Sequence, residues 1–141
     1  MRNSIASSII ISVIALGVVN AQDKTKVKMV QLSQTSPASG EQMFTTYCAV
    51  CHGADGRGGG PAAAALKTQP SNLTQLAAKN NGNYPQLQVM GTLSGKDVVA
   101  HGSQEMPIWG ELFKSLGSGN RQVIHLRLLN LTTYIQSIQE K

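Results

Sequence analysis

Hydrophobic residues recur at helical spacing toward the C-terminal end of the chain. They stand at successive intervals of four, three, four and three residues, at Ile124, Leu128, Leu131, Ile135 and Ile138. This spacing places apolar side chains on one face of an α-helix and polar side chains on the other. The preceding Asn120 has a side chain suited to an N-cap. The pattern therefore predicts an amphipathic helix that begins after Asn120 and packs one face against a core.

A second apolar stripe lies earlier in the chain, where Met43, Phe44 and Tyr47 are spaced as neighbours on one helix face. Ser39 can cap the start of this helix. Gln42 stands three residues later, at the position from which a glutamine closes a capping box. We expect a first helix that starts after Ser39 and carries the residues that follow Tyr47.

Glycine, proline and asparagine divide the chain between these two helices. Residues 53–60 are rich in glycine and predict a loop. Residues 61–66 predict a helical turn, residues 72–78 a helix capped by its first residue, and residues 85–93 a third helix. Residues 97–101 add a further turn. No hairpin pattern and no internal repeat is present in the sequence, so we expect an all-α fold with long loops.

The N-terminal residues resemble a targeting segment, and we expect residues 1–21 to be a signal peptide. Arg2 gives a positive start, residues 5–19 are apolar, and Ala21 offers a small side chain at a cleavage site. A retained membrane anchor is the alternative, but about 15 apolar residues fall short of a bilayer span. The prediction is an exported, periplasmic protein without stable membrane insertion.

The chain after this segment divides into two parts. Residues 22–38 are polar and rich in lysine, which predicts a flexible leader. Residues 39–141 then form one small domain. Aromatic residues make up only 4% of the chain, so its side chains alone provide a thin core. A buried prosthetic group would supply the missing apolar body.

The strongest chemical motif is Cys48-Ala49-Val50-Cys51-His52. Two cysteines three positions apart, followed at once by histidine, form the attachment motif of a c-type haem. The two thiols can add across the two vinyl groups of one haem, and the histidine can bind the iron from the proximal side. The sequence therefore predicts covalently attached haem c, held by Cys48 and Cys51, with His52 as an iron ligand.

Three alternatives compete for the same cysteines. A structural zinc site needs about four ligands in spaced pairs, whereas His101 and His125 are single. A thioredoxin-like site requires a strand before the motif and a helix after it, and no clear apolar β-run flanks it. A plain disulfide remains the simplest alternative.

Met106 is the candidate for the second iron ligand, within Met106-Pro107-Ile108-Trp109-Gly110. Proline fixes the backbone and can hold the methionine sulfur in an irregular loop that points inward. Trp109 can pack on the porphyrin edge and donate its indole N–H to a propionate. His101, five residues earlier, is the main competitor; Met90 and His125 have weaker claims.

From residue 39 onward the chain resembles the class I c-type cytochromes. Four features occur in the family's order: a first helix leading into Cys-x-x-Cys-His, a glycine-rich loop ending in Gly60-Pro61, the Met-Pro-x-Trp-Gly stretch, and a closing amphipathic helix. The resemblance implies the cytochrome c fold, with about four to five helices around one haem. It also implies that the first and last helices cross, which would bring Gly40 and Phe44 toward Tyr134.

The resemblance further implies a haem environment. The Pro61 carbonyl would accept a hydrogen bond from His52 and so orient the imidazole. Arg57 is a candidate partner for a haem propionate. Together with His52 and Met106 as axial ligands, these residues complete the predicted site.

The expected function is that of a one-electron carrier in which haem iron cycles between Fe(II) and Fe(III). No catalytic constellation is evident from the sequence, so we expect neither an enzyme nor a small-molecule substrate.

The net charge of +5 comes from scattered basic residues, which fit ordinary solubility or steering toward an acidic redox protein. Nucleic acid is disfavoured, because no aromatic residues interleave with the charges. The alternatives are a relay subunit of a larger dehydrogenase or oxidase, and a five-coordinate haem that senses gas or reduces peroxide.

Overall fold

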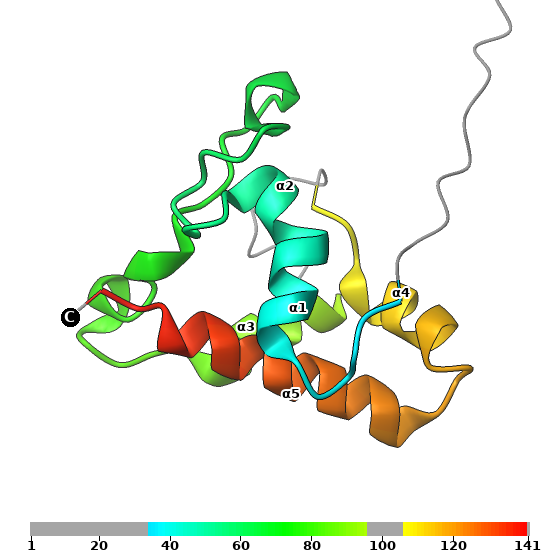
Figure 1. The fold of residues 1–141 in the computed structure, drawn as a ribbon. Coiled ribbons are helices and arrows are strands. Elements are labelled where there is room, and N and C mark those ends of the chain that lie inside the picture. The colour runs from blue at the N-terminus through cyan, green and yellow to red at the C-terminus, as the bar shows by residue number, and fades with distance from the viewer. Residues whose placement is uncertain (1–33, 96–105, 141) are drawn as a thin grey trace, which may run out of the picture. The chain divides into compact units, whose positions relative to one another are not determined.

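A computed structural model describes residues 34–95 and 106–140 (Figure 1). The predicted signal peptide, residues 22–33 of the predicted leader, and His101 with its predicted turn lie outside the described residues. Within the described part of the chain there are five α-helices and no strand, which confirms the all-α class. No helix in this part is long and apolar enough to span a bilayer.

The first helix consists of three segments in direct succession. Helix α1 (Gly40–Met43) passes into a π-helical turn (Phe44–Cys48) and then into α2 (Ala49–His52). Ser39 caps its start as predicted, because its hydroxyl accepts a hydrogen bond from the Gln42 N–H at 3.1 Å. The prediction that the Gln42 side chain closes the capping box is wrong, because that side chain accepts a hydrogen bond from the Ser36 N–H at 2.8 Å. The Ser39 N–H is already directed to the Ser36 carbonyl.

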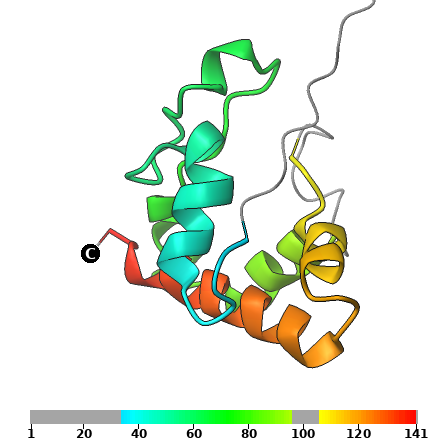
Figure 2. The same cartoon turned by 45° about the vertical axis from the view of Figure 1, so that its right-hand side comes forward.

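Helix α5 (Arg121–Ser137) is the long amphipathic helix that the spacing predicted. The Asn120 side chain accepts hydrogen bonds from the N–H groups of Gln122 and Val123 at 2.9 and 3.4 Å, so it is the predicted cap. Figures 1 and 2 both show α1 crossing α5, and the two helices are in contact.

The crossing depends on Gly40, which has no side chain. A Cβ atom placed there would lie 2.7 Å from the Cβ of Tyr134 on α5. One turn further along, the rings of Phe44 and Tyr134 pack with their centroids 5.2 Å apart. The expected approach of the first and last helices is therefore confirmed.

Two of the predicted helical segments are shorter than expected. Residues 61–66 contain only the 3₁₀ turn Ala63–Ala65. The helix expected over residues 72–78 is replaced by 3₁₀ turns at Leu73–Gln75 and Ala78–Asn80. Backbone groups of this segment bond instead to residues beyond α5: Gln139 and Glu140, called the clamp below, bind the Leu73 and Thr74 carbonyls and the Ala77 N–H. These groups are thus unavailable to an α-helix.

Helices α3 (Gln86–Ser94) and α4 (Trp109–Leu116) complete the fold. Helix α3 matches the third predicted helix to within one residue. Helix α4 was not predicted, because the Met-Pro stretch was interpreted as an irregular loop. Its apolar residues nevertheless recur at helical spacing: Trp109, Leu112, Phe113 and Leu116.

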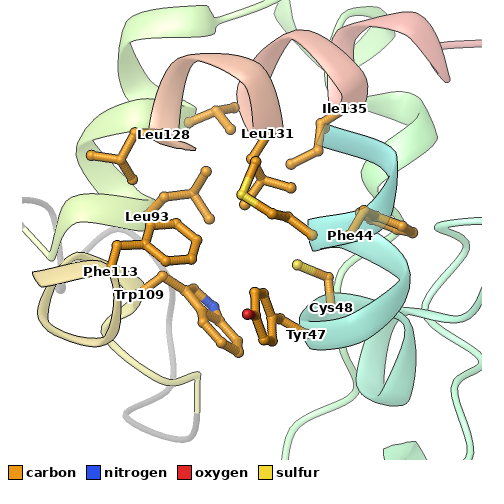
Figure 3. Close-up of a cluster of buried hydrophobic side chains, with 11 residues drawn as sticks. Phe44, Tyr47, Cys48, Leu93, Trp109, Phe113, Leu128, Leu131 and Ile135 are labelled. Carbon is orange, nitrogen blue, oxygen red and sulfur yellow. The ribbon is translucent and has the colours of Figure 1, made fainter. Parts of the chain in front are cut away.

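The core lies between the first helix and helices α3, α4 and α5 (Figure 3). On one side of it the rings of Tyr47, Trp109 and Phe113 pack together. The Tyr47 ring centroid lies 5.6 Å from that of Trp109 and 6.1 Å from that of Phe113. This aromatic wall, Tyr47, Trp109 and Phe113, joins the helix that carries the cysteines to the helix that follows Met106.

Candidate functional site

A cavity of about 480 Å³ opens beside the aromatic wall. It lies in the size range of sites that hold cofactors and small molecules. Its lining comes from the end of the first helix, from the loop over residues 66–80, from α3, and from residues 106–109. Cys48, Cys51, His52 and Met106 all line it. Chain segments that are far apart in the sequence therefore place all four predicted attachment and ligand residues around one space.

The glycine-rich loop fixes the end of the helix that carries the motif. Its N–H groups bond to the last carbonyl groups of the helix: Gly58 N–H to His52 at 2.6 Å and Gly60 N–H to Cys51 at 3.0 Å. Residue 60 must be small, because a Cβ there would lie 2.6 Å from the Cys51 carbonyl carbon. The loop thus caps the helix and holds Cys51 and His52 against the cavity.

Both cysteine thiols are free in the structure. Cys48 is only 5% exposed, and this burial, with a smaller contribution from the neighbouring Cys51, raises the pKa of its thiol to about 12. Thiol–disulfide exchange depends on a thiolate with a lowered pKa. The environment of Cys48 therefore does not fit the thioredoxin-like alternative, and it places a neutral thiol against an apolar cavity.

His52 is oriented by a hydrogen bond. Its Nδ1 lies 2.9 Å from the Ser71 carbonyl oxygen, so this nitrogen donates and Nε2 is left as the basic nitrogen. Burial lowers the pKa of His52, and the bond to Ser71 opposes that change. A neutral imidazole held in one tautomer by a carbonyl is the usual state of a metal-binding histidine.

The carbonyl predicted for this role was that of Pro61, but in this structure the His52 Nδ1 bonds to Ser71. Pro61 is exposed and does not line the cavity. It directly follows Gly60, whose N–H bonds to the Cys51 carbonyl at the end of the helix. Ser71 reaches His52 from the turn that begins at Asn72, whose side chain accepts from the Thr74 N–H at 2.9 Å. The Asn72 cap was predicted from the sequence, but the closeness of this turn to His52 was not.

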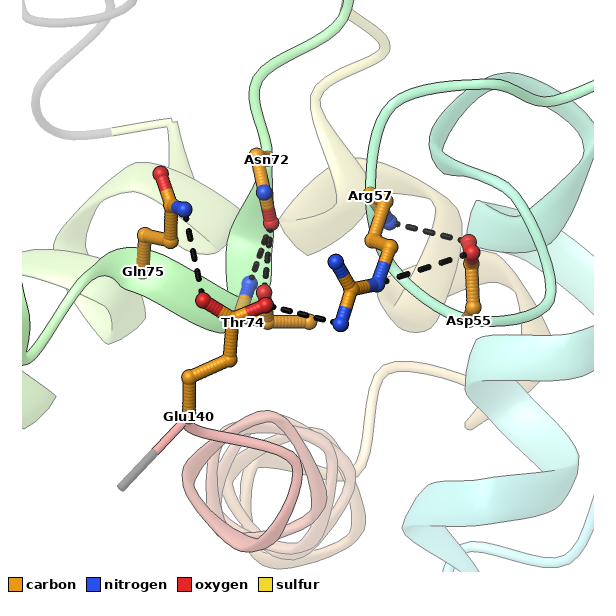
Figure 4. A network of polar contacts seen from close by, with 6 residues as sticks. All are labelled: Asp55, Arg57, Asn72, Thr74, Gln75 and Glu140. Atoms are coloured by element: carbon orange, nitrogen blue, oxygen red, sulfur yellow. Dashed lines mark hydrogen bonds and ion pairs between the residues drawn. The ribbon is translucent and has the colours of Figure 1, made fainter.

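Arg57 also differs from expectation. Its Nη2 lies 2.8 Å from a carboxylate oxygen of Glu140 in the clamp, and its Nε lies 3.9 Å from Asp55 (Figure 4). Arg57 does not line the cavity. These ion pairs tie the glycine-rich loop to the segment after α5, and pairing of Arg57 with a haem propionate stays a prediction.

The Met-Pro stretch lies where the sequence analysis expected it. Met106, Pro107 and Trp109 line the cavity, and Trp109 is almost fully buried. The two weaker candidates, Met90 and His125, do not line it. Of the candidates in the described residues, only Met106 joins His52 at the cavity.

The residues around the cavity fit a covalently attached, iron-containing ring. The lining of the cavity offers apolar and aromatic side chains, two free thiols at motif spacing, an imidazole with a defined basic nitrogen, and a thioether sulfur. Imidazole and thioether are both established axial ligands of haem iron. No other group in the described residues is needed to complete this donor set.

Comparison with known proteins supports the same conclusion. A family model described as Cytochrome c matches residues 37–110, which is more than half of the chain. The match includes the motif, the glycine-rich loop, the cavity-lining loop and Met106. No curated protein and no solved structure matched the chain.

Proposed function

Because the chain belongs to the cytochrome c family, we propose that it is an exported one-electron carrier with a single haem c. The family binds haem c covalently and uses it for electron transfer. One observation carries the proposal for this chain: Cys48, Cys51, His52 and Met106 line the same cavity. Two of these positions supply thiols for attachment, and the other two supply axial ligands of different chemistry.

Each residue has a defined task in this proposal. Cys48 and Cys51 would form the thioether bonds, His52 would bind iron through Nε2, and Met106 would bind it through its sulfur. The bound haem supplies an iron that gains and loses one electron. Ser71 keeps the His52 ring in one orientation, and Tyr47 and Trp109 provide buried aromatic surface along the cavity.

The ligand pair determines which oxidation state is favoured. A thioether is a soft ligand, so ligation by histidine and methionine favours Fe(II) and raises the reduction potential relative to two histidines. If His52 and Met106 both bound the iron, no coordination position would be left for a gas or peroxide. This is the property that separates a carrier from a five-coordinate sensor or peroxidase.

The experiment that tests attachment is denaturing gel electrophoresis followed by haem staining. The stain should stay with the polypeptide, and it should be lost when Cys48 and Cys51 are both replaced by alanine. Conservative controls are Cys48→Ala and Cys51→Ala alone, each of which keeps one thioether bond. Complete removal of haem from the unaltered protein by acid–acetone extraction would contradict the proposal.

A relay subunit of a larger dehydrogenase or oxidase is the second candidate. One apolar side chain beside the cavity favours it, since Ile108, between the lining residues Pro107 and Trp109, is 46% exposed. Exposed apolar surface next to a cofactor is typical of a stable protein contact. Size measurement of the protein isolated without detergent separates the two functions: a monomer supports the free carrier, and a stable larger complex supports the relay subunit.

A further inference from the structure

A buried positive charge lies behind the aromatic wall of the cavity. Arg127, on α5, is only 4% exposed. Its Nη1 donates to the Thr35 hydroxyl at 3.0 Å and its Nη2 to the Thr35 carbonyl at 2.8 Å. The carbon of the guanidinium lies 5.8 Å from the centre of the Phe113 ring.

All of these contacts are with neutral groups. No carboxylate among the described residues lies within ion-pair distance of Arg127. Its Nε is buried without a hydrogen-bond partner. A buried charge normally has a counter-charge, because removing it from water otherwise costs several kcal/mol. Hydrogen bonds to Thr35 and the contact with the Phe113 ring offset only part of this cost.

Arg127 is connected to the cavity by a short series of contacts. The Thr35 hydroxyl, which accepts from Arg127, donates to the Tyr47 hydroxyl at 3.1 Å. Tyr47 itself lines the cavity. Phe113, beneath the guanidinium, packs against both Tyr47 and Trp109, and Figure 3 shows these three rings together. The positive charge is therefore one hydrogen-bonded residue away from a side chain of the cavity.

We propose that the buried positive charge of Arg127 raises the reduction potential of the haem. This inference rests on the proposed function. The oxidised site carries one more positive charge than the reduced site, so a fixed positive charge nearby favours the reduced site. Because Arg127 is buried, the interaction acts through protein of low dielectric constant and is little weakened by salt.

The chain provides a matched control on the same helix. Arg121 is exposed at the start of α5 and does not line the cavity. Its charge is surrounded by water and mobile ions, which screen it. Loss of the Arg121 charge should therefore leave the reduction potential almost unchanged.

The test is a spectroelectrochemical titration of the haem-loaded protein at low and at high salt. Arg127→Met removes the charge and keeps a long apolar side chain. At a fixed ambient potential the Fe(II)/Fe(III) ratio should fall roughly tenfold, which is about 59 mV for one electron, and equally at both salt concentrations. Arg121→Met should change the ratio less than about twofold, and Arg127→Lys, which keeps the charge, should recover most of the loss.

A second variant protects the test against misfolding. Thr35→Asp leaves Arg127 in place and sets a carboxylate against it, so it should lower the potential in the same direction. A potential that is unchanged in Thr35→Asp, or equal shifts in Arg121→Met and Arg127→Met, would overturn the inference. If haem staining is negative in the unaltered protein, the proposed function fails. If haem is attached and its reduction potential is the same with and without the Arg127 charge, only this inference fails.

Discussion

Replacement of Gly40 by alanine tests the helix crossing that positions the haem motif. The added Cβ would lie 2.7 Å from the Cβ of Tyr134 and 2.8 Å from the carbonyl carbon of Asn130. Both atoms belong to or adjoin the α5 backbone, so relief requires the two helices to move apart. Overpacking of this kind costs about 1–3 kcal/mol. The better helix propensity of alanine returns up to about 1 kcal/mol.

The net expectation for Gly40→Ala is a loss of about 1–2 kcal/mol in the free energy of unfolding. Chemical denaturation of the haem-loaded protein, followed by far-ultraviolet circular dichroism, measures it. The Soret band should shift as well, because the displaced helix carries Cys48, Cys51 and His52.

Gly59→Ala is the matched control. A Cβ at this position meets no heavy atom of the described residues within 4 Å, and the backbone is not in the left-handed region. This variant should be neutral or slightly stabilised, because alanine restricts the unfolded chain. If Gly40→Ala is as stable as Gly59→Ala, the close crossing of α1 and α5 is not a determinant of stability and the reasoning is refuted.

Three further predictions concern the ligand, the clamp and the partner. Met106→Ala should admit carbon monoxide to the reduced protein and remove the weak far-red band of iron–methionine ligation; if His101→Ala removes that band instead, Met106 is not the ligand. Gln139→Ala should cost about 1–3 kcal/mol in denaturant unfolding, since its side chain binds the Leu73 and Ile135 carbonyls and the Ala77 N–H, whereas exposed Gln136→Ala should cost almost nothing. Electron transfer to an acidic redox partner should slow as salt rises, and a bimolecular rate that stays constant would argue against electrostatic steering.

Local sequence patterns were sufficient to predict the two helices that build the fold. The spacing from Ile124 to Ile138 and the Asn120 cap define α5, and Ser39 defines the start of the first helix. Each of these features depends on residues within a few positions of one another. The Cys48–His52 motif is equally local, so its two cysteines and its histidine could be proposed as a haem site from the sequence, and the structure places all three at one cavity.

Features that depend on distant segments could not be predicted in this way. The choice of Ser71 over Pro61 as the partner of His52 depends on the path of the 66–80 loop. That path is set by hydrogen bonds from the clamp, which no local pattern reveals. Arg127 was likewise interpreted as one of several scattered basic residues, because its contacts, Thr35 and Phe113, lie far from it in the sequence.

The clamp also affects the order in which parts of the site can form. A chain is synthesised from its N-terminal end, so Cys48 and His52 are made long before Gln139 and Glu140. Until the clamp is available, the loop that carries Ser71 lacks the hydrogen bonds to the Leu73 and Thr74 carbonyls and to the Ala77 N–H. The side of the cavity that this loop forms is therefore completed late, once Gln139 and Glu140 are in place.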